Sequence, residues 1–323
     1  MQPPMRNTPN VLLWTDSPGP YIDAIAKAGL ADRVAIEALS RKTQPSDAQR
    51  AHTHVLLAAG APAGLLPAMP NLQWAQSLTA GVEGWLALPD LPPDLTLTCA
   101  RGTHRESMPE NILGALFHIA KPYTAIADDN RQGIWTQRVA TPLNGTTLGI
   151  LGLGEIGQEV ARLATALGMR VIGTKRRPAP MPNVAEVLPP DRTDEVLAQS
   201  DYVLLLLPAT PETDNFINAG RLLKMKPGAW LLNFGRGHLI KDDDLIAAVK
   251  SGTIAGAVLD VFRQEPLPAA HPFWTTDGIM VLPHIGGPHP QRDTIVARLF
   301  VENLERFLDG RPLRQVVDRD AGY

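Results

Sequence analysis

The sequence contains a single cysteine, Cys99, among 323 residues. One cysteine cannot form a disulfide within the chain, which excludes the disulfide-rich secreted class and suits a reducing compartment. Long apolar runs are missing too, since none approaches the roughly 20 residues that a membrane-spanning helix needs. The first ten residues include three prolines and no apolar stretch, unlike a signal peptide. We therefore expect a cytoplasmic protein.

An excess of charge of either sign is also absent. The formal net charge is −3, and 20% of the residues are charged, so nothing argues for a nucleic acid or an anionic membrane as a partner. The chain has eight histidines, but no pair of histidines or cysteines has the spacing of a metal site. The composition thus gives no reason to expect a metal, a membrane or a nucleic acid as a ligand.

A glycine-rich motif is the most informative stretch of the chain. The apolar run at residues 147–151 has the length of a strand and precedes Gly152, Gly154 and Gly157, spaced as G-x-G-x-x-G. Apolar residues then recur at helical spacing, and residues 169–174 have the pattern of a second strand. In this frame the first glycine permits a tight turn, the second lets a pyrophosphate approach the backbone, and the third lets helix and strand pack closely. The motif predicts a dinucleotide site with its phosphates at the N-terminus of the helix.

Three consecutive cations, Lys175, Arg176 and Arg177, follow the second strand. A site for NAD usually has an acidic residue near this point, which accepts a hydrogen bond from the 2′-hydroxyl of the ribose. The cations would suit the 2′-phosphate of NADP, although a solvated basic turn is an alternative interpretation. We predict NADP as the preferred cofactor, with NAD as the second choice.

Short apolar strands alternate with helical patterns on both sides of this motif. Further candidate strands lie at residues 11–15, 34–39, 54–59, 72–78, 95–100, 201–208, 229–233, 255–259 and 279–282. This alternation is typical of parallel α/β sheets, and 323 residues is long for a single core. We predict an α/β protein with two Rossmann-like doubly wound domains. A long helix from residue 107 should lead into the second domain, and a last helix at 294–307 should return to the first.

Arg236, Glu265 and His284 each lie a few residues beyond one of the last three strands. Ligands of an open α/β sheet bind outside the carboxyl ends of its strands, so these side chains should face the cofactor. Arg236 could bind a substrate carboxylate with its forked guanidinium and polarise the neighbouring carbonyl. His284 could give a proton to that carbonyl oxygen as a hydride arrives from the nicotinamide, and Glu265 could stabilise the imidazolium. The three residues predict reduction of a small 2-oxo acid.

Over nearly its whole length the sequence resembles the D-isomer-specific 2-hydroxyacid dehydrogenase family. The resemblance rests on the spacing of Arg236, Glu265 and His284 and on the stretches at residues 152–157, 206–213, 222–228, 233–237, 260–266 and 283–287. The cations that begin at Lys175 make it most similar to glyoxylate and hydroxypyruvate reductases that use NADPH. The resemblance implies that Arg236, Glu265 and His284 are the catalytic residues.

The resemblance also implies an arrangement of the chain that the pattern alone does not give. It implies a formate/glycerate dehydrogenase-like fold with a cleft between its two domains. Residues 1–100 and 289–323 would form a substrate-binding domain, and residues 101–288 a dinucleotide-binding domain. It further implies a homodimer formed through the dinucleotide-binding domain.

Binding residues follow from the same resemblance. The backbone amides of Leu78, Thr79, Ala80 and Gly81 are expected to bind the substrate carboxylate, together with Arg236 and His284. The residues expected to hold the cofactor are Gly152, Gly154, Glu155, Ile156, Gly157, Thr174, Lys175, Arg176, Arg177, Pro208 and Asp260. Asp260 would lie near the nicotinamide.

Alternative functions remain open at this point. A nucleotide-sensing regulatory protein could use the same fold, and phosphite dehydrogenases have the same three residue types. Formate oxidation is less favoured, because the relatives that perform it have glutamine in place of Glu265. Residues 101–110 match the family pattern only in part, so His104 and Arg105 are further candidates for substrate contacts, as is His289.

Overall fold

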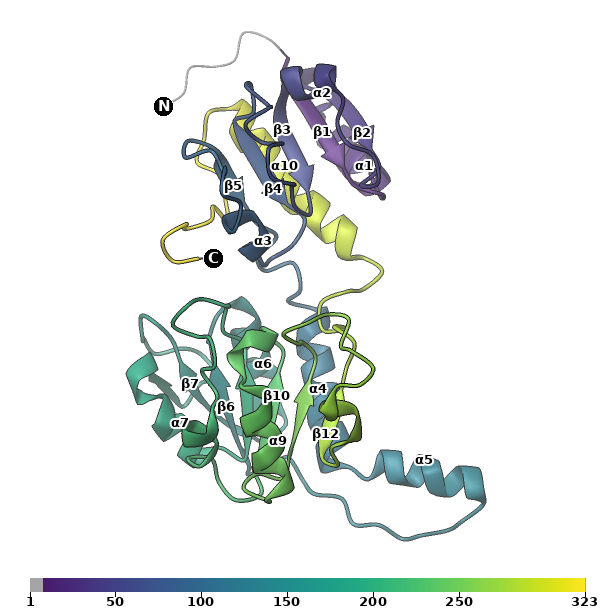
Figure 1. Ribbon diagram of the computed structural model, residues 1–323, viewed down its shortest axis with the longest axis vertical. Coiled ribbons are helices and arrows are strands. Elements are labelled where there is room, and N and C mark those ends of the chain that lie inside the picture. Colours follow the sequence, from purple (N-terminus) through teal and green to yellow (C-terminus); the bar gives the residue numbers. More distant parts are fainter. Residues whose placement is uncertain (1–7, 323) are drawn as a thin grey trace. The chain divides into compact units, whose positions relative to one another are not determined.

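The computed structural model describes residues 8–322, which divide into two compact units. Unit 1 comprises the described residues of Met1–Thr103 and His289–Tyr323, and unit 2 comprises His104–Pro288 (Figure 1). Each unit is built on its own parallel β-sheet. The expected α/β class with two parallel sheets is therefore confirmed.

Within its described residues, unit 1 has a five-stranded sheet in the order β2-β1-β3-β4-β5. The strands are β1 (Asn10–Trp14), β2 (Ala35–Leu39), β3 (Thr53–Ala58), β4 (Trp74–Ser77) and β5 (Thr96–Thr98). The helices are α1 (Gly19–Lys27), α2 (Asp47–His52), α3 (Glu83–Leu86) and α10 (Arg292–Leu308). Since successive side chains of a strand point to opposite faces, Val11 and Leu13 pack with α1 and α10, whereas Leu12 and Trp14 pack on the face covered by α3.

The C-terminal part of the chain completes unit 1. Helix α10 packs along α1 and places Phe300 against Trp74, with ring centroids 5.2 Å apart (Figure 1). After α10 the chain runs along β5, where the N–H of Val317 donates to the carbonyl of Leu97 at 2.9 Å. Helix α10 therefore lies in unit 1 although it is distant in sequence from the strands of that unit.

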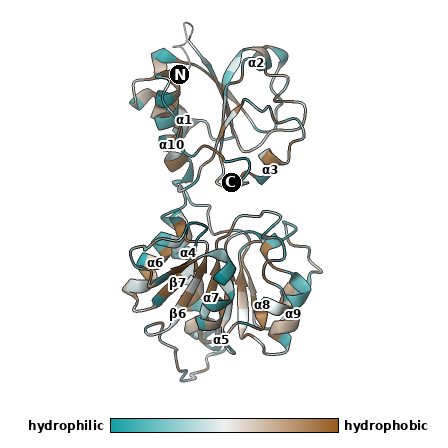
Figure 2. Ribbon diagram, turned by 90° about the vertical axis from the view of Figure 1, so that its left-hand side faces the viewer, coloured by the Kyte–Doolittle hydropathy of each residue, from teal (hydrophilic) through white to brown (hydrophobic). Residues whose placement is uncertain are grey.

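Unit 2 has a seven-stranded sheet in the order β12-β11-β10-β9-β6-β7-β8. The strands are β6 (Thr147–Leu151), β7 (Arg170–Thr174), β8 (Glu186–Leu188), β9 (Tyr202–Leu205), β10 (Trp230–Asn233), β11 (Gly256–Leu259) and β12 (Ile279–Val281). The order changes direction between β6 and β9, and such a switch point is where an open α/β sheet binds its ligand. The strands are strongly apolar, as Figure 2 shows for β6 and β7, because helices cover both faces of the sheet.

Two layers of helices enclose this sheet. The helices of unit 2 are α4 (Ser107–Ala120), α5 (Tyr123–Gln132), α6 (Glu155–Ala166), α7 (Thr193–Gln199), α8 (Ala219–Leu222) and α9 (Asp242–Lys250). One face packs against α4 and α6, and the other against α7, α8 and α9. Helix α5 differs from the rest, because it buries none of its residues. Among the described residues, no helix is both long and apolar enough to cross a membrane.

Several elements, most of them short, were not expected from the sequence. They are helices α3, α5 and α8, strand β8, and the 3₁₀ turns at Ala31–Arg33, Pro190–Arg192, Gly237–Leu239 and Pro272–Thr275. Strand β9 is also shorter than expected, because it ends at Leu205 and the chain continues as a loop through Pro208.

Candidate active site

The turn between β6 and α6 has little room for side chains. Gly152 has a φ of +107°, and a Cβ there would lie 2.9 Å from the carbonyl carbon of Leu206, so glycine is required on both grounds. A Cβ at Gly157 would lie 2.7 Å from the carbonyl oxygen of Gly152. At Gly154, by contrast, no heavy atom of the described residues other than its chain neighbours and the backbone of α6 lies within 4 Å of the Cβ position. The turn is thus packed against its own unit on two sides and open at Gly154.

The N-terminus of α6 adjoins this open position. Gly154 is the N-cap residue and offers no side chain to the helix. Among the described residues, the N–H groups of Glu155 and Ile156 find no acceptor. These donors and the positive end of the helix dipole fit a pyrophosphate, so the residues present fit a dinucleotide. The side chain of Glu155 forms an ion pair with Arg105, in which Oε2 of Glu155 lies 3.3 Å from Nη1 of Arg105.

The end of β7 is joined to the same turn. The carbonyl of Thr174 accepts hydrogen bonds from the N–H groups of Gly152, at 3.3 Å, and Leu153, at 2.9 Å. Lys175 continues the pairing with β8 through its N–H and half-buries its side chain, whose Nζ lies 3.9 Å from Sδ of Met181. Arg176 and Arg177 are exposed. The cations therefore follow directly on the strand whose end contacts the glycine turn.

The loop after β9 carries Pro208, whose carbonyl accepts a hydrogen bond from the hydroxyl of Thr213 at 2.7 Å. In this loop, a hydrogen bond from the Thr210 hydroxyl lowers the pKa of Glu212, and the positive charge of Arg176 adds to that effect. Arg176 is thus close enough to act electrostatically on the loop after β9. The ends of β7 and β9 both adjoin the glycine turn, because the carbonyl of Thr174 accepts from its N–H groups and Leu206 packs against Gly152.

Asp260 directly follows β11 and is 1% exposed. Its Oδ1 accepts from the N–H of Ile285 at 2.7 Å, and its Oδ2 from the N–H of Gly286 at 3.0 Å. Burial raises the pKa of Asp260, while these two hydrogen bonds act in the opposite direction. Asp260 thereby ties the loop after β12 to the end of β11. Asn111 of α4 supports the same loop by donating to the carbonyl of Ile285 at 3.0 Å.

His284 and Glu265 form a close pair. Nδ1 of His284 lies 2.6 Å from Oε2 of Glu265, and Oε1 of Glu265 accepts from the N–H of Phe262 at 2.9 Å. The contact occupies Nδ1, so Nε2 is the ring nitrogen that can serve a substrate. The His284 backbone is left-handed, with a φ of +53°, which is uncommon for a residue other than glycine. The loop therefore holds this histidine in a defined orientation.

Arg236 lies on the loop after β10, which Asn233 shapes from a fully buried position. The Asn233 side chain donates to the carbonyl of Arg236 at 2.9 Å and accepts from the N–H of Gly235 at 3.1 Å. A Cβ at Gly237 would lie 1.9 Å from the carbonyl carbon of Phe262, so this loop packs directly on the loop that carries Glu265. Because β10, β11 and β12 are neighbours in the sheet, the structure brings Arg236, Glu265 and His284 to one sheet edge.

The loop at residues 78–81 belongs to unit 1 and follows β4. The N–H of Leu78 donates to the carbonyl of Ala58 at 2.9 Å, and the N–H of Thr79 donates to Oγ of Ser77 at 3.2 Å. The N–H groups of Ala80 and Gly81 find no acceptor in the part of the chain that the structure describes. Two of the four amides that were expected to bind a carboxylate thus already donate within unit 1, and only those of Ala80 and Gly81 are left without an acceptor among the described residues.

The other candidate residues have varied surroundings. The ring of His104 lies 3.2 Å from the Cβ position of Gly287, so His104 contacts the loop that follows His284. Sequence reasoning missed Asn111, which supports this loop, because one asparagine in a helical pattern gives no signal of such a contact. No group of three or more His, Cys, Asp or Glu side chains that could hold a metal is found among the described residues.

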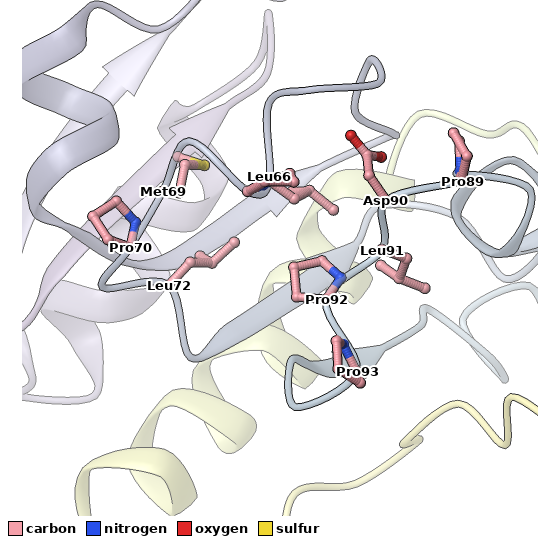
Figure 3. Close-up of a pocket in the computed structure, with 10 residues that line it drawn as sticks. Leu66, Met69, Pro70, Leu72, Pro89, Asp90, Leu91, Pro92 and Pro93 are labelled. Atoms are coloured by element: carbon pink, nitrogen blue, oxygen red, sulfur yellow. The ribbon is translucent and has the colours of Figure 1, made fainter.

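A separate apolar pocket of about 520 Å³ lies in unit 1 (Figure 3). It is lined by Leu66, Pro67, Met69, Pro70, Leu72, Pro89, Asp90, Leu91, Pro92 and Pro93. None of the residues expected to bind substrate or cofactor is among them. The pocket therefore has no part in the candidate site.

Comparison with known proteins gives a consistent picture. A family model described as "D-isomer specific 2-hydroxyacid dehydrogenase, NAD binding domain" matches residues 113–286. A glyoxylate/hydroxypyruvate reductase B from Yersinia pestis bv. Antiqua (strain Nepal516) is 32% identical over 256 residues, which cover 75% of this chain and 76% of the relative. A glycerate dehydrogenase from Methylorubrum extorquens is 32% identical over 231 residues, covering 68% of this chain and 70% of that protein.

Solved structures agree with these matches. A D-isomer specific 2-hydroxyacid dehydrogenase family protein from Aeromonas salmonicida has a TM-score of 0.87 at 33% identity, covering 97% of this chain and 100% of its own. An NADPH-dependent glyoxylate/hydroxypyruvate reductase from Sinorhizobium meliloti, in complex with NADP and sulfate, has a TM-score of 0.84 at 28% identity, covering 98% and 100%.

Proposed function

The chain belongs to the D-isomer specific 2-hydroxyacid dehydrogenase family, and we propose that it reduces small 2-oxo acids, with glyoxylate and hydroxypyruvate as the leading substrates. NADPH is the preferred hydride donor and a D-2-hydroxy acid is the product. The observation that carries this proposal is the His284–Glu265 pair at 2.6 Å, on the sheet edge that also carries Arg236. The proposal includes a cytoplasmic location, which suits the free thiol of Cys99.

The reaction uses each of the three side chains differently. The nicotinamide, when bound, supplies the hydride. Arg236 binds the substrate carboxylate and polarises the carbonyl group through its guanidinium. His284 donates the proton on Nε2 to the carbonyl oxygen, which becomes the hydroxyl of the product. Glu265 accepts a hydrogen bond from Nδ1, which fixes the orientation of the ring and the direction of Nε2.

Cofactor and substrate contacts extend this scheme to both units. Unit 2 is proposed to bind the dinucleotide through the glycine turn, the N–H groups of Glu155 and Ile156, and residues 174–177, 208 and 260. The preference for NADPH rests on Lys175 and its two neighbouring arginines, because no carboxylate stands there to accept from a ribose hydroxyl. Unit 1 is proposed to be the substrate-binding domain, with the Ala80 and Gly81 N–H groups as donors to the substrate carboxylate.

The experiment is an assay of NADPH oxidation with glyoxylate, hydroxypyruvate, pyruvate and an aromatic 2-oxo acid, with NADH run in parallel. We expect turnover of the smaller acids and a higher kcat/KM for NADPH than for NADH. No turnover with any acid and either cofactor would reject the proposal. Oxidation of phosphite would then indicate a phosphite dehydrogenase. Cofactor-dependent binding of a partner protein without turnover would indicate a nucleotide-sensing regulatory protein.

We further propose that the protein is a homodimer formed through unit 2. The observation in favour is a set of exposed apolar side chains on α5 and the chain after it, namely Tyr123, Ile134, Trp135 and Val139. This segment extends away from the sheet of its own unit (Figure 1). Trp135 is 98% exposed and Val139 94%, and apolar patches of this kind mark interaction surfaces.

Sedimentation of the Trp135→Ser/Val139→Ser variant tests the dimer. We expect its dissociation constant to rise by about tenfold or more, because two buried apolar side chains would be lost from the interface. Trp274→Ser is the matched control, since Trp274 is an exposed tryptophan of unit 2 outside the patch. A wild-type protein that sediments as a monomer at micromolar concentration would refute the proposal.

A further inference from the structure

Arg292 is the first residue of α10 and contacts the loop at residues 78–81 of the same unit. Its Nη2 donates a hydrogen bond to the carbonyl oxygen of Leu78. Its Nη1 donates to Oδ1 of Asp293 at 2.7 Å, and the same oxygen accepts from the hydroxyl of the fully buried Tyr21 at 3.3 Å. One side of the guanidinium is therefore hydrogen-bonded to the Asp293 carboxylate, which Tyr21 also holds. The other side is hydrogen-bonded to the loop through the carbonyl of Leu78.

The position of Arg292 is not explained by the stability of α10. A cation in the first turn of a helix faces the positive end of the helix dipole, which is electrostatically unfavourable. Asp293 offsets this charge through its ion pair with Arg292. The contact that remains to account for an arginine here is the one with the Leu78 carbonyl.

The loop itself is fixed mainly through its carbonyl groups. The Leu78 carbonyl accepts from Arg292, the Thr79 carbonyl from the N–H of Ala100 at 3.0 Å, and the Gly81 carbonyl from Oγ1 of Thr79 at 2.7 Å. In a trans peptide the N–H points opposite to the C=O of the same unit. The fixed carbonyls therefore set the N–H directions of Thr79, Ala80 and Val82, and the Ala80–Gly81 peptide, which carries the Gly81 N–H, lies between two fixed peptides. The N–H groups of Ala80 and Gly81 have no acceptor within the described chain.

We propose that Arg292 is a positioning residue for recognition of the substrate carboxylate. It locks the Leu78–Thr79 peptide, the first of the loop, and so restricts the two following peptides, whose Ala80 and Gly81 N–H groups receive the two carboxylate oxygens. This inference rests on the proposed function, because it assigns to unit 1 the binding of the substrate's carboxylate end. Its effect falls on substrate affinity and not on proton transfer, which belongs to residues of unit 2.

Kinetics of Arg292→Gln and Arg292→Lys with glyoxylate and NADPH test the proposal. For Arg292→Gln we expect the KM for glyoxylate to rise about tenfold, with kcat and the KM for NADPH within about twofold of wild type. Lysine keeps the charge and can donate one hydrogen bond to the Leu78 carbonyl, so it should recover part of the lost affinity. Arg298→Gln is the matched control, since Arg298 is an exposed arginine of the same helix.

Each outcome decides the matter. An unchanged KM for glyoxylate in Arg292→Gln would overturn the proposal. So would an equal loss in kcat and in affinity for both substrates together with a lower Tm, because that pattern belongs to a purely structural role. If Arg292→Gln does not fold, Asp293→Asn is the second variant, because it weakens the hydrogen bond between residue 293 and Arg292 and should raise the KM for glyoxylate about threefold. An unchanged KM in Asp293→Asn would then overturn the positioning role of Arg292.

The wild-type enzyme, measured in the same assay, separates this inference from the proposed function. Turnover of glyoxylate by the wild type with no effect of the Arg292 substitutions would reject the positioning role alone. Absence of 2-oxo acid turnover in the wild type would reject the proposed function, and the positioning role with it.

Discussion

The two units share an architecture but offer different chemistry at the ends of their strands. In unit 2 the loops after β10, β11 and β12 present an arginine, a carboxylate and a histidine. In unit 1 the loop after β4 presents backbone N–H groups, and the side chains around it, such as Arg292 and Ser77, serve to hold the backbone in place. Catalysis by proton transfer requires a titratable side chain, whereas binding a carboxylate requires only donors of fixed direction.

This difference predicts two kinds of sensitivity to mutation. Unit 2 should be sensitive to the chemical nature of particular side chains. Unit 1 should tolerate a change of side chain in its loop but not the loss of an N–H group. Three substitutions test this contrast, beginning with the one for which the largest effect is expected.

Replacing His284 by asparagine should lower kcat about 10²- to 10⁴-fold, because the proton donor is lost. Asparagine tolerates the left-handed backbone at this position, where φ is +53°, so the loop should keep its shape. The measurement is kcat for glyoxylate reduction at saturating NADPH. His271→Asn is the control, because Nδ1 of His271 caps a 3₁₀ turn, a role that asparagine can fill. A kcat within about threefold of wild type would remove His284 from the mechanism.

Replacing Lys175 by aspartate should change the choice of cofactor. A carboxylate at this point repels a 2′-phosphate and can accept from a 2′-hydroxyl, so the ratio of kcat/KM for NADPH over NADH should fall about 10- to 100-fold. Lys224→Asp is the control, because Lys224 is exposed and precedes β10, at the opposite edge of the sheet. If Lys175→Asp retains the wild-type ratio of kcat/KM for NADPH over NADH, as the control should, the cations form a solvated turn and do not determine the choice of cofactor.

Replacing Ala80 by proline removes one N–H group from the loop of unit 1. We expect the KM for glyoxylate to rise about tenfold with a smaller change in kcat. Ala80→Ser, which keeps the N–H, should stay within about twofold of wild type. Thermal unfolding of both variants checks that the loop change is local. An equal rise in the KM for glyoxylate in both variants would show that the side chain at position 80, and not its N–H group, matters, which would contradict the expected difference between the two units.

The sequence was sufficient to predict the parts of the molecule that depend on local pattern. The β6–α6–β7 frame was predictable because the glycine spacing, the apolar strand and the helical periodicity lie within one contiguous stretch. The placement of Arg236, Glu265 and His284 at one edge followed from the direction of parallel strands. The 2.6 Å contact between His284 and Glu265 agrees with the pairing that the sequence had suggested.

Features that depend on distant or unusual contacts were not predictable. Helix α5 buries no residue, so it has no apolar face for a periodicity argument to detect. Strand β8 has three residues and is defined by its pairing with β7. The engagement of the Leu78 N–H by Ala58 depends on how β3 and β4 align, and the grip of Arg292 on Leu78 joins positions 214 residues apart. Such contacts come from tertiary packing, which leaves no mark in local residue spacing.

The division of unit 1 between the two ends of the chain has a consequence for folding during synthesis. Unit 2 is one continuous segment, so all of its strands are available once Pro288 has left the ribosome. Unit 1 must wait for α10 to cover Val11 and Leu13, and for Val317 to pair with the edge of β5. The strands of unit 1 before residue 100 thus emerge before those of unit 2, but their apolar face stays partly uncovered until α10 has been synthesised, and such exposed surface promotes aggregation of a folding intermediate.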